Sequence, residues 1–293
     1  MDIAKLKEIR KLVLISMFAD DDLLELFVLK GGSAIELAYK IDARSSIDVD
    51  LSIENDISED NLKTVETKIH ASLDKVFNSE GYIVFDFNFD HRPKRLHDGF
   101  PESWGGYNVT FKIISEDKGH ILETNIDLAR KMAEGIDLND KRTFKIEISK
   151  YEYTRNKSEK NIDGYTIYVY TPEMIVIEKL RALCQRMNDY QFHMSGKPPR
   201  TKDIYDIYVI TEKLNVSILD HMDLIRDVFE LKKVPIKLLG NIKGLYEHYL
   251  QGLPTLQATI PGGIDERKFQ LCFEHVVSLA EQIIEQDQLK RAN

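Results

Sequence analysis

Residues Leu29–Ile53 read LKGGSAIELAYKIDARSSIDVDLSI, and this stretch decides the fold. Its first part is a short apolar run that stops at Gly31 and Gly32, after which Ser33 can cap a helix that continues to Tyr39. We therefore predict a strand, a glycine turn and the N-terminus of a helix. Glycines let a bulky anion approach the backbone, and the N–H groups at a helix N-terminus favour phosphate. The turn is thus predicted to bind the triphosphate of a nucleotide.

The second part of the stretch, Ile47–Ile53, alternates apolar and polar residues, which is typical of a half-buried strand. Asp48 and Asp50 then share one face. Two neighbouring carboxylates repel each other unless a cation lies between them, and oxygen ligands of this kind suit Mg²⁺. We expect one or two Mg²⁺ ions at this strand. Each half also has an ordinary explanation, since Gly-Gly-Ser is often only a turn and alternating aspartates often face solvent.

The order of glycine turn, helix and Asp-x-Asp strand resembles the signature of the DNA polymerase beta-like nucleotidyltransferase superfamily. More narrowly, Leu29–Ser33 followed by Arg44, Ser46, Asp48 and Asp50 is similar to the AbiEii/AbiGii toxin family of bacterial abortive-infection and toxin–antitoxin systems. The resemblance implies an α/β (α+β) fold, with a nucleotidyltransferase-type mixed sheet flanked by helices and followed by an α-helical C-terminal domain.

The resemblance also implies site residues. The nucleotide would be bound by Lys30, Gly31, Gly32, Ser33, Arg44 and Lys179. A third carboxylate would complete the metal site from a neighbouring strand, and Glu147, between Ile146 and Ile148, matches it. Asp86 is the rival for this position, and sequence order alone does not decide between them.

A second block, which includes Lys179 and Asp203, resembles the family further along the chain. In the family the lysine faces the nucleotide phosphates and the aspartate lies in the cleft; the alternative is a salt bridge that joins two helices. The connection 188–199 is longer than the family pattern.

A cap at Thr171 followed by a proline predicts a sheet-to-helix boundary. We expect residues 1–170 to form the catalytic domain and residues 171–293 a helical domain that completes the cleft.

The implied activity is transfer of NMP from an NTP to an acceptor hydroxyl, with pyrophosphate leaving toward Lys179 and Lys30. Relatives in the toxin family modify the 3′ end of tRNA, with a cognate antitoxin as relief; a protein or a small molecule is the other kind of acceptor. Two further hypotheses remain. One is an antibiotic-modifying nucleotidyltransferase, and the other is a non-catalytic nucleotide-binding or interaction module of the same fold.

Composition limits the other classes of protein. The chain has 293 residues, 43% hydrophobic and 30% charged, which is typical of a folded protein with two lobes. Its net charge of −9 argues against a general nucleic-acid coat. Local basic stretches could still contact a substrate: Lys145, Lys150, Arg155, Lys157 and Lys160; Lys197, Arg200 and Lys202; and Arg226, Lys232, Lys233, Lys237 and Lys243.

The sequence carries neither a run long enough to span a bilayer nor a secretory hydrophobic region at its start, so we expect a cytoplasmic protein without membrane contact. Cys184 and Cys272 stand in apolar helical patterns, which favours buried thiols over a disulfide or a metal site.

The acidic run Asp20–Asp22 is predicted to cap a helix. The strand Tyr82–Phe89 is expected to hold its apolar residues, at 83, 85, 87 and 89, on one side.

Overall fold

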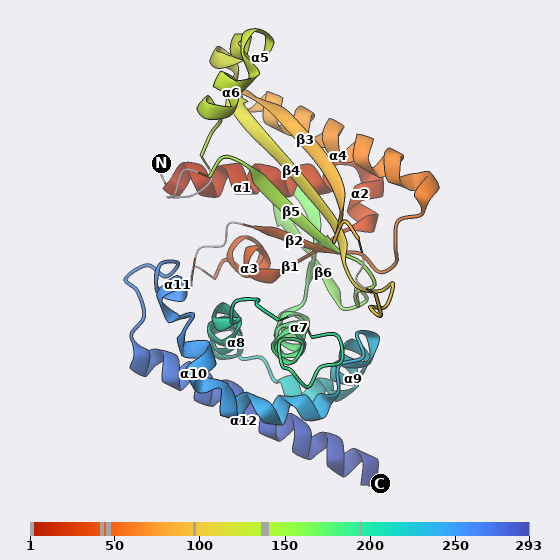
Figure 1. Cartoon of the computed structure of the whole chain (residues 1–293), viewed down its shortest axis with the longest axis vertical. Coiled ribbons are helices and arrows are strands. Elements are labelled where there is room, and N and C mark those ends of the chain that lie inside the picture. The colour runs from red at the N-terminus through yellow and green to blue at the C-terminus, as the bar shows by residue number, and fades with distance from the viewer. Residues whose placement is uncertain are drawn as a thin grey trace. The chain divides into compact units, whose positions relative to one another are not determined.

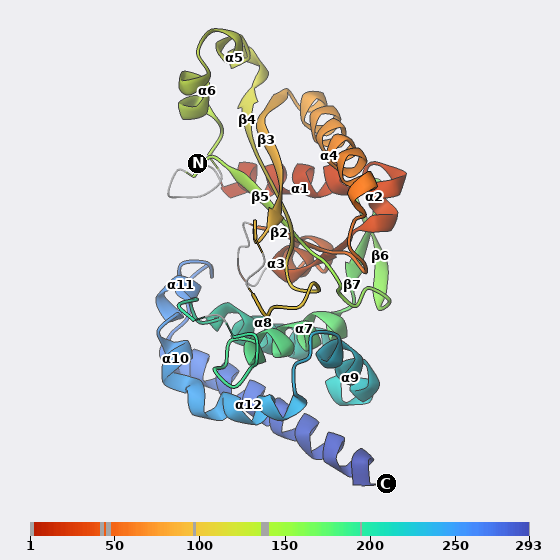
Figure 2. The ribbon, with the colours of Figure 1, turned by 45° about the vertical axis from the view of Figure 1, so that its right-hand side comes forward.

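The computed structural model describes residues 3–41, 44, 48–95, 98–135, 141–193 and 195–292. The chain forms two compact units. The first comprises Met1–Lys40 and Ser46–Val169, and the second comprises Ile41–Ser45 and Tyr170–Asn293. Figures 1 and 2 show the elements of both.

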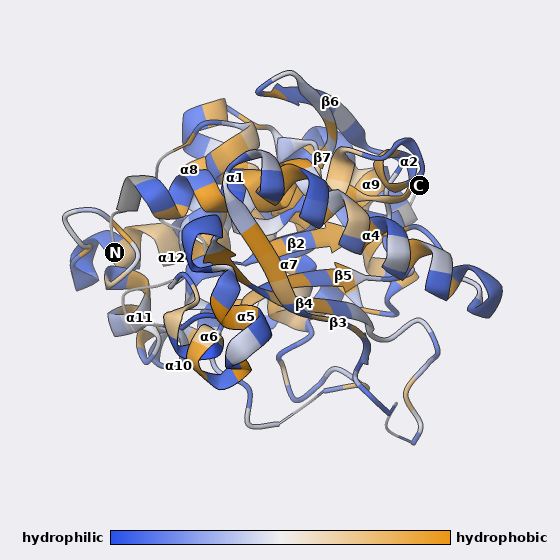
Figure 3. Cartoon of the chain, turned by 90° about the horizontal axis from the view of Figure 1, so that it is seen from above, coloured by the Kyte–Doolittle hydropathy of each residue, from blue (hydrophilic) through white to orange (hydrophobic). Residues whose placement is uncertain are grey.

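The first unit is a sheet with helices. Its helical segments are α1 (Ile3–Phe18), α2 (Asp21–Leu26), α3 (Gly31–Ser33), the π-helix η1 (Ala34–Ala38), α4 (Glu59–Ser79), the 3-10 helix η2 (Glu116–Lys118), α5 (His120–Thr124) and α6 (Ile126–Met132). Its strands are β1 (Val28–Lys30), β2 (Val49–Ser52), β3 (Tyr82–Arg92), β4 (Gly106–Ser115), β5 (Phe144–Ser149), β6 (Lys157–Ile162) and β7 (Tyr165–Tyr170). The hydrophilic strand β6, whose residues are mostly blue in Figure 3, was not predicted. Asp20 caps α2 as expected, accepting hydrogen bonds from the backbone N–H groups of Asp22 and Leu23.

The strands form one mixed sheet in the order β3-β4-β5-β2-β1-β7-β6. β2 pairs with β1 antiparallel and with β5 parallel, and β5 pairs with β4 antiparallel. One face of the sheet is apolar and buries residues such as Leu51, Val109 and Ile146 completely. Helices α1 and α4 pack against each other, and α1 contacts β2 while α4 contacts β3 (Figure 1). The other face is polar, as the period-two alternation of β2 and β5 requires.

A β-bulge changes the expected pattern of β3. Asp86 has a positive φ of 51°, and the register with β4 shifts between Phe85 and Asn88. The extra residue reverses which side the following residues face. Phe85 therefore joins a small cluster with Ile121 and other residues of α5 and α6, whereas Phe87 stacks on His70 of α4. The prediction that the four apolar residues of β3 share one side is wrong.

The second unit is helical in its described residues. Its segments are α7 (Pro172–Cys184), α8 (Thr201–Leu214), the 3-10 helix η3 (Ile218–His221), α9 (Met222–Leu231), the 3-10 helix η4 (Ile236–Leu245), α10 (Tyr246–Leu250), α11 (Leu253–Gln257) and α12 (Glu266–Ala292). Thr171 caps α7, accepting a hydrogen bond from the Met174 N–H group, and proline follows it at the first turn. Cys184 and Cys272 are free and buried, as predicted. The fold class expected from the sequence is confirmed, and among the described residues no helix is long and apolar enough to cross a membrane.

Candidate active site

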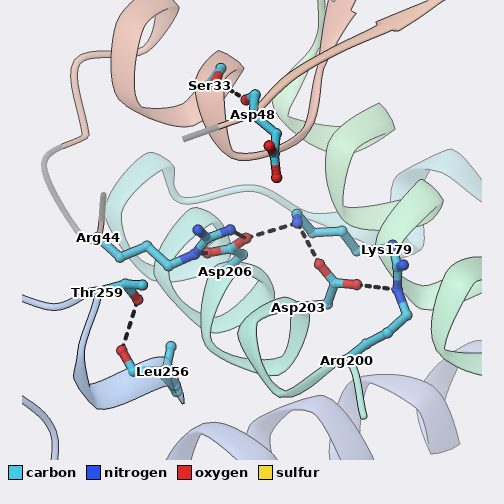
Figure 4. Close-up of polar contacts among 9 residues, drawn as sticks. All are labelled: Ser33, Arg44, Asp48, Lys179, Arg200, Asp203, Asp206, Leu256 and Thr259. Carbon is cyan, nitrogen blue, oxygen red and sulfur yellow. Dashed lines mark hydrogen bonds and ion pairs between the residues drawn. The ribbon is translucent and has the colours of Figure 1, made fainter. Parts of the chain in front are cut away.

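The glycine turn connects β1 to a short helix. The helix begins at Gly31, so Ser33 lies inside it and the predicted cap at Ser33 is wrong. The Ser33 side chain is fully buried, and its Oγ donates a hydrogen bond to the backbone carbonyl of Asp48 at 2.6 Å (Figure 4). This bond fixes the helix against the segment that enters β2. Ser33 therefore positions Asp48 rather than presenting its hydroxyl to solvent.

Gly31 lies directly against Asp50. Its φ is +70°, a backbone conformation that side-chain-bearing residues rarely adopt, and a Cβ atom at this position would lie 2.5 Å from Asp50 Oδ2. Only glycine fits without displacing the carboxylate. The turn and the acidic strand, which the sequence predicts separately, are thus in contact.

A row of polar residues crosses the sheet in register. Lys30 pairs with Asp50, Asp50 with Glu147, Glu147 with Asn108, and Asn108 with Asp90. Residues in register on adjacent strands point to the same side of a sheet. Glu147 therefore lies on the polar face beside Asp50.

The rival carboxylate, Asp86, lies elsewhere. It stands at the bulge of β3, three strands away from β2, where Lys112 and Arg130 donate hydrogen bonds to it at 3.2 and 2.7 Å. Arg130, and then Lys112, hold the pKa of Asp86 below its usual value. Asp86 thus belongs to a separate ion-pair cluster.

The three predicted metal ligands do not converge in this structure. Within the described residues, no three histidine, cysteine or acidic groups lie close enough together to hold a metal ion. Glu147 instead accepts hydrogen bonds from Arg92 and Lys145. Burial alone would raise the pKa of Glu147, but Lys145 and Arg92 outweigh this effect and lower it. Asp48, in contrast, is exposed, and its carboxylate has no ion-pair partner among the described residues.

Lys30 is less accessible than its place next to the turn suggests. Only 7% of it is exposed, and its Nζ lies 3.6 Å from Oε1 of Glu152, which is also buried. Lys30 thus reaches the polar face at the position opposite Asp50 while it is paired with a carboxylate.

A buried ion-pair network organises the second unit. Lys179, on α7, donates hydrogen bonds to Asp203 at 2.7 Å and to Asp206 at 2.8 Å, both on α8 (Figure 4). Arg200 binds Asp203 at 2.5 Å, and Arg44 binds both oxygens of Asp206 at 2.6 Å. The salt bridge between two helices, one of the two alternatives considered for Lys179 and Asp203, is therefore present.

Charge balance explains the stability of this network. Burial raises the pKa of Asp206, but Arg44 and Lys179 outweigh it and hold the pKa below the usual value. Burial likewise raises the pKa of Asp203, while Arg200 and Lys179 lower it well below its usual range. Sequence reasoning gave Asp206 no role and counted Arg200 only among the basic residues that could contact a substrate. The three-residue spacing of the two aspartates, which places both on one side of α8, was the available signal.

The glycine turn lies against an acidic strand on a mixed sheet, which is the arrangement expected for a nucleotidyltransferase. The model of the family described as nucleotidyl transferase AbiEii toxins of type IV TA (toxin–antitoxin) systems matches residues 13–282. The chain therefore belongs to the AbiEii nucleotidyltransferase toxin family. No curated protein sequence matches it.

Solved structures of nucleotidyltransferases are similar to this chain. The nucleotidyltransferase toxin MenT4 of Mycobacterium tuberculosis H37Rv is 11% identical, with a TM-score of 0.50, over 95% of this chain and 83% of that one. An antigenic nucleotidyltransferase-like protein of Paracoccidioides brasiliensis is 17% identical, with a TM-score of 0.39 over 85% and 94% of the two chains. The antibiotic-resistance factor ANT(2'')-Ia is 13% identical, with a TM-score of 0.36 over 86% and 100%. At such low identity the likeness to MenT4 shows the fold alone.

Proposed function

We propose that this nucleotidyltransferase moves NMP from an NTP to a hydroxyl of an RNA acceptor on the polar face beside the glycine turn. The contact between Gly31 and Asp50 supports this most strongly, because it brings a turn that admits phosphate against a carboxylate. In the reaction the acceptor oxygen bonds to the α-phosphorus and the bond to the bridging oxygen breaks. Pyrophosphate leaves, and the hydroxyl proton passes to a carboxylate or to water.

Three carboxylates are a donor set that suits a divalent cation, which we propose is Mg²⁺, although they do not surround a common point in the described structure. Asp48 offers an exposed carboxylate without a cationic partner in the described part of the chain, and it directly precedes β2, which carries Asp50. Glu147 would become the third ligand if its carboxylate turned away from Arg92 and Lys145. A bound Mg²⁺ would neutralise charge on the phosphates.

The other residues assigned from the sequence then divide by role. Gly31 and Gly32 would admit the phosphates, while Ser33 and the Lys30–Glu152 pair would hold the turn in place. Arg44, Lys179 and Asp203 remain part of the proposal as positioning residues, since each is engaged in the buried network of the second unit. We propose that this helical unit completes the nucleotide cleft.

Membership of a toxin family supports a growth-arresting role and a cognate antitoxin. We propose the 3′ end of tRNA as the acceptor, because a nucleotide added there blocks aminoacylation. An antibiotic-modifying enzyme would not arrest growth on expression, so growth with and without a hydroxylated drug separates the two hypotheses.

The experiment that tests the proposal is incubation with each α-labelled NTP, Mg²⁺ and total RNA, followed by sizing of the labelled RNA. We expect one NTP to label RNA of tRNA size and Asp48→Asn to abolish the labelling. Asp60→Asn, an exposed acid in the first turn of α4, is the matched control and should retain it. Labelling by Asp48→Asn at the wild-type rate would refute the proposal.

A further inference from the structure

Arg92 reaches Glu147 across an intervening strand. Arg92 ends β3 and Glu147 lies on β5, with β4 between them. The β4 residue in register with Arg92 is Gly106, which has no side chain to block the crossing. A Cβ atom at Gly106 would collide with the carbonyl oxygen of Ile148, so only glycine fits there. The register also aligns Arg92, through Gly106, with Ser149, two residues from Glu147 on β5, so both side chains lie on the same side of the sheet.

The two cationic side chains that bind Glu147 are more exposed to solvent than its carboxylate. The side chains of Arg92 and Lys145 are 51% and 39% exposed, compared with 21% for Glu147. A guanidinium has five N–H donors in a planar fork that matches carboxylate or phosphate. An anionic ligand can therefore reach Arg92 from solvent and compete with Glu147 for it.

A neighbouring residue has an unused hydrogen-bond acceptor. Asn108 follows Glu147 in the row across the sheet, and its Oδ1 is buried without a hydrogen-bond partner among the described residues. A buried acceptor without a donor is costly, and a water molecule or a bound group can supply the donor.

The position of Arg92 in the sheet indicates which part of the reaction it serves. Four strand spacings separate β3 from β1, which is about 19 Å. The glycine turn follows β1, so the departing pyrophosphate lies on that side of Asp50 and Glu147. The attacking and leaving oxygens are roughly in line in phosphoryl transfer. The acceptor therefore approaches from the side of Arg92 and Lys145, where a polyanion is attracted and a cationic drug is repelled.

We propose that Arg92 couples acceptor binding to completion of the metal site: a phosphodiester group of the polynucleotide takes the guanidinium from Glu147, whose carboxylate is then free to join Asp50 at the metal. Lys145 assists as the second cation. This inference rests on the proposed function, names an acceptor-binding residue and predicts low NTP turnover before the acceptor binds.

The test measures metal binding rather than activity. Free Mn²⁺, used in place of Mg²⁺, is followed by electron paramagnetic resonance during titration of the full chain, with and without a short single-stranded RNA. Binding of Mn²⁺ to the RNA alone is subtracted. We expect the RNA to tighten Mn²⁺ binding about five- to tenfold, within the usual range of coupling between sites. Linkage requires Mn²⁺ to tighten RNA binding, measured by fluorescence anisotropy, by the same factor.

Variants separate the inference from general effects of charge. Arg92→Gln should bind Mn²⁺ more tightly than the wild type without RNA and should lose the coupling, and Arg92→Gln with Lys145→Gln should show both effects more strongly. Arg92→Lys keeps the charge but not the fork, so it should retain part of the coupling. Lys63→Gln, which removes an 81% exposed cation from α4, is the matched control and should behave as the wild type.

Several results would overturn the inference. These are failure of RNA to bind the wild type, absence of coupling when RNA is bound, full coupling in Arg92→Gln, or coupling to an aminoglycoside instead of RNA. Coupling without nucleotide transfer under any condition would reject the proposed function and leave the coupling by Arg92 standing. Transfer to RNA without coupling would reject only the role of Arg92.

Discussion

Replacing Gly31 by alanine should damage the active site much more than the fold. A non-glycine residue in the left-handed region costs about 1–2 kcal/mol, so the free energy of unfolding should fall by this amount. In addition, the new Cβ would lie 2.5 Å from Asp50 Oδ2, whereas ordinary contacts begin at 3.4 Å. The carboxylate must therefore move by about 1 Å, and a displacement of this size can lower the rate about a hundredfold.

Gly164→Ala is the matched control for this prediction. Gly164 lies at the turn between β6 and β7 with a φ of +89°, and nothing lies within 4 Å of a Cβ added there. Both variants should lose similar stability in urea denaturation, but only Gly31→Ala should lose label transfer from the α-labelled NTP. The reasoning would be refuted if Gly31→Ala transferred label as fast as Gly164→Ala.

Three further predictions concern ion pairs. Asp206→Ala leaves Arg44 without its buried partner and should lower the free energy of unfolding by about 3–5 kcal/mol in urea denaturation. Glu281→Ala removes one partner of an exposed pair and should change this free energy by less than about 1 kcal/mol. Equal effects of the two substitutions would contradict the prediction. The pKa values of Asp203 and Asp206 are lowered in the folded protein, so their contribution to stability is present above about pH 4 and is lost at lower pH. Asp206→Asn should therefore flatten the acid side of a plot of Tm against pH. An unchanged acid slope would count against the network. Asp86→Ala should leave nucleotide transfer unchanged, because Asp86 pairs with Lys112 and Arg130 away from Asp50. If Asp86→Ala lost as much transfer activity as Glu147→Ala, Asp86 would be the third carboxylate of the site instead of Glu147.

Patterns that depend on local spacing could be predicted from the sequence. The alternation around Asp48 and Asp50 predicts a strand, and the structure has one, β2, although it begins at Val49 and so contains only Asp50; the cap at Thr171 marks the start of α7. These features depend on the two-residue period of a strand and on the chemistry of a helix end, both of which neighbouring residues determine. The family resemblance rests on the same local motifs.

Contacts between distant segments were decided only by the tertiary structure. The parallel pairing of β2 with β5 brings Glu147 beside Asp50, and the register of β3 with β4 places Asp90, not Asp86, in that row. The sequence indicated that each is an acid within a strand, but register depends on backbone hydrogen bonds with another strand. The same reason applies to Arg92, which contacts Glu147 across the strand that lies between them, and to Asp206, whose partners come from separate parts of the chain. Local sequence therefore determined which chemical groups are present, whereas strand and helix pairing decided which of them meet.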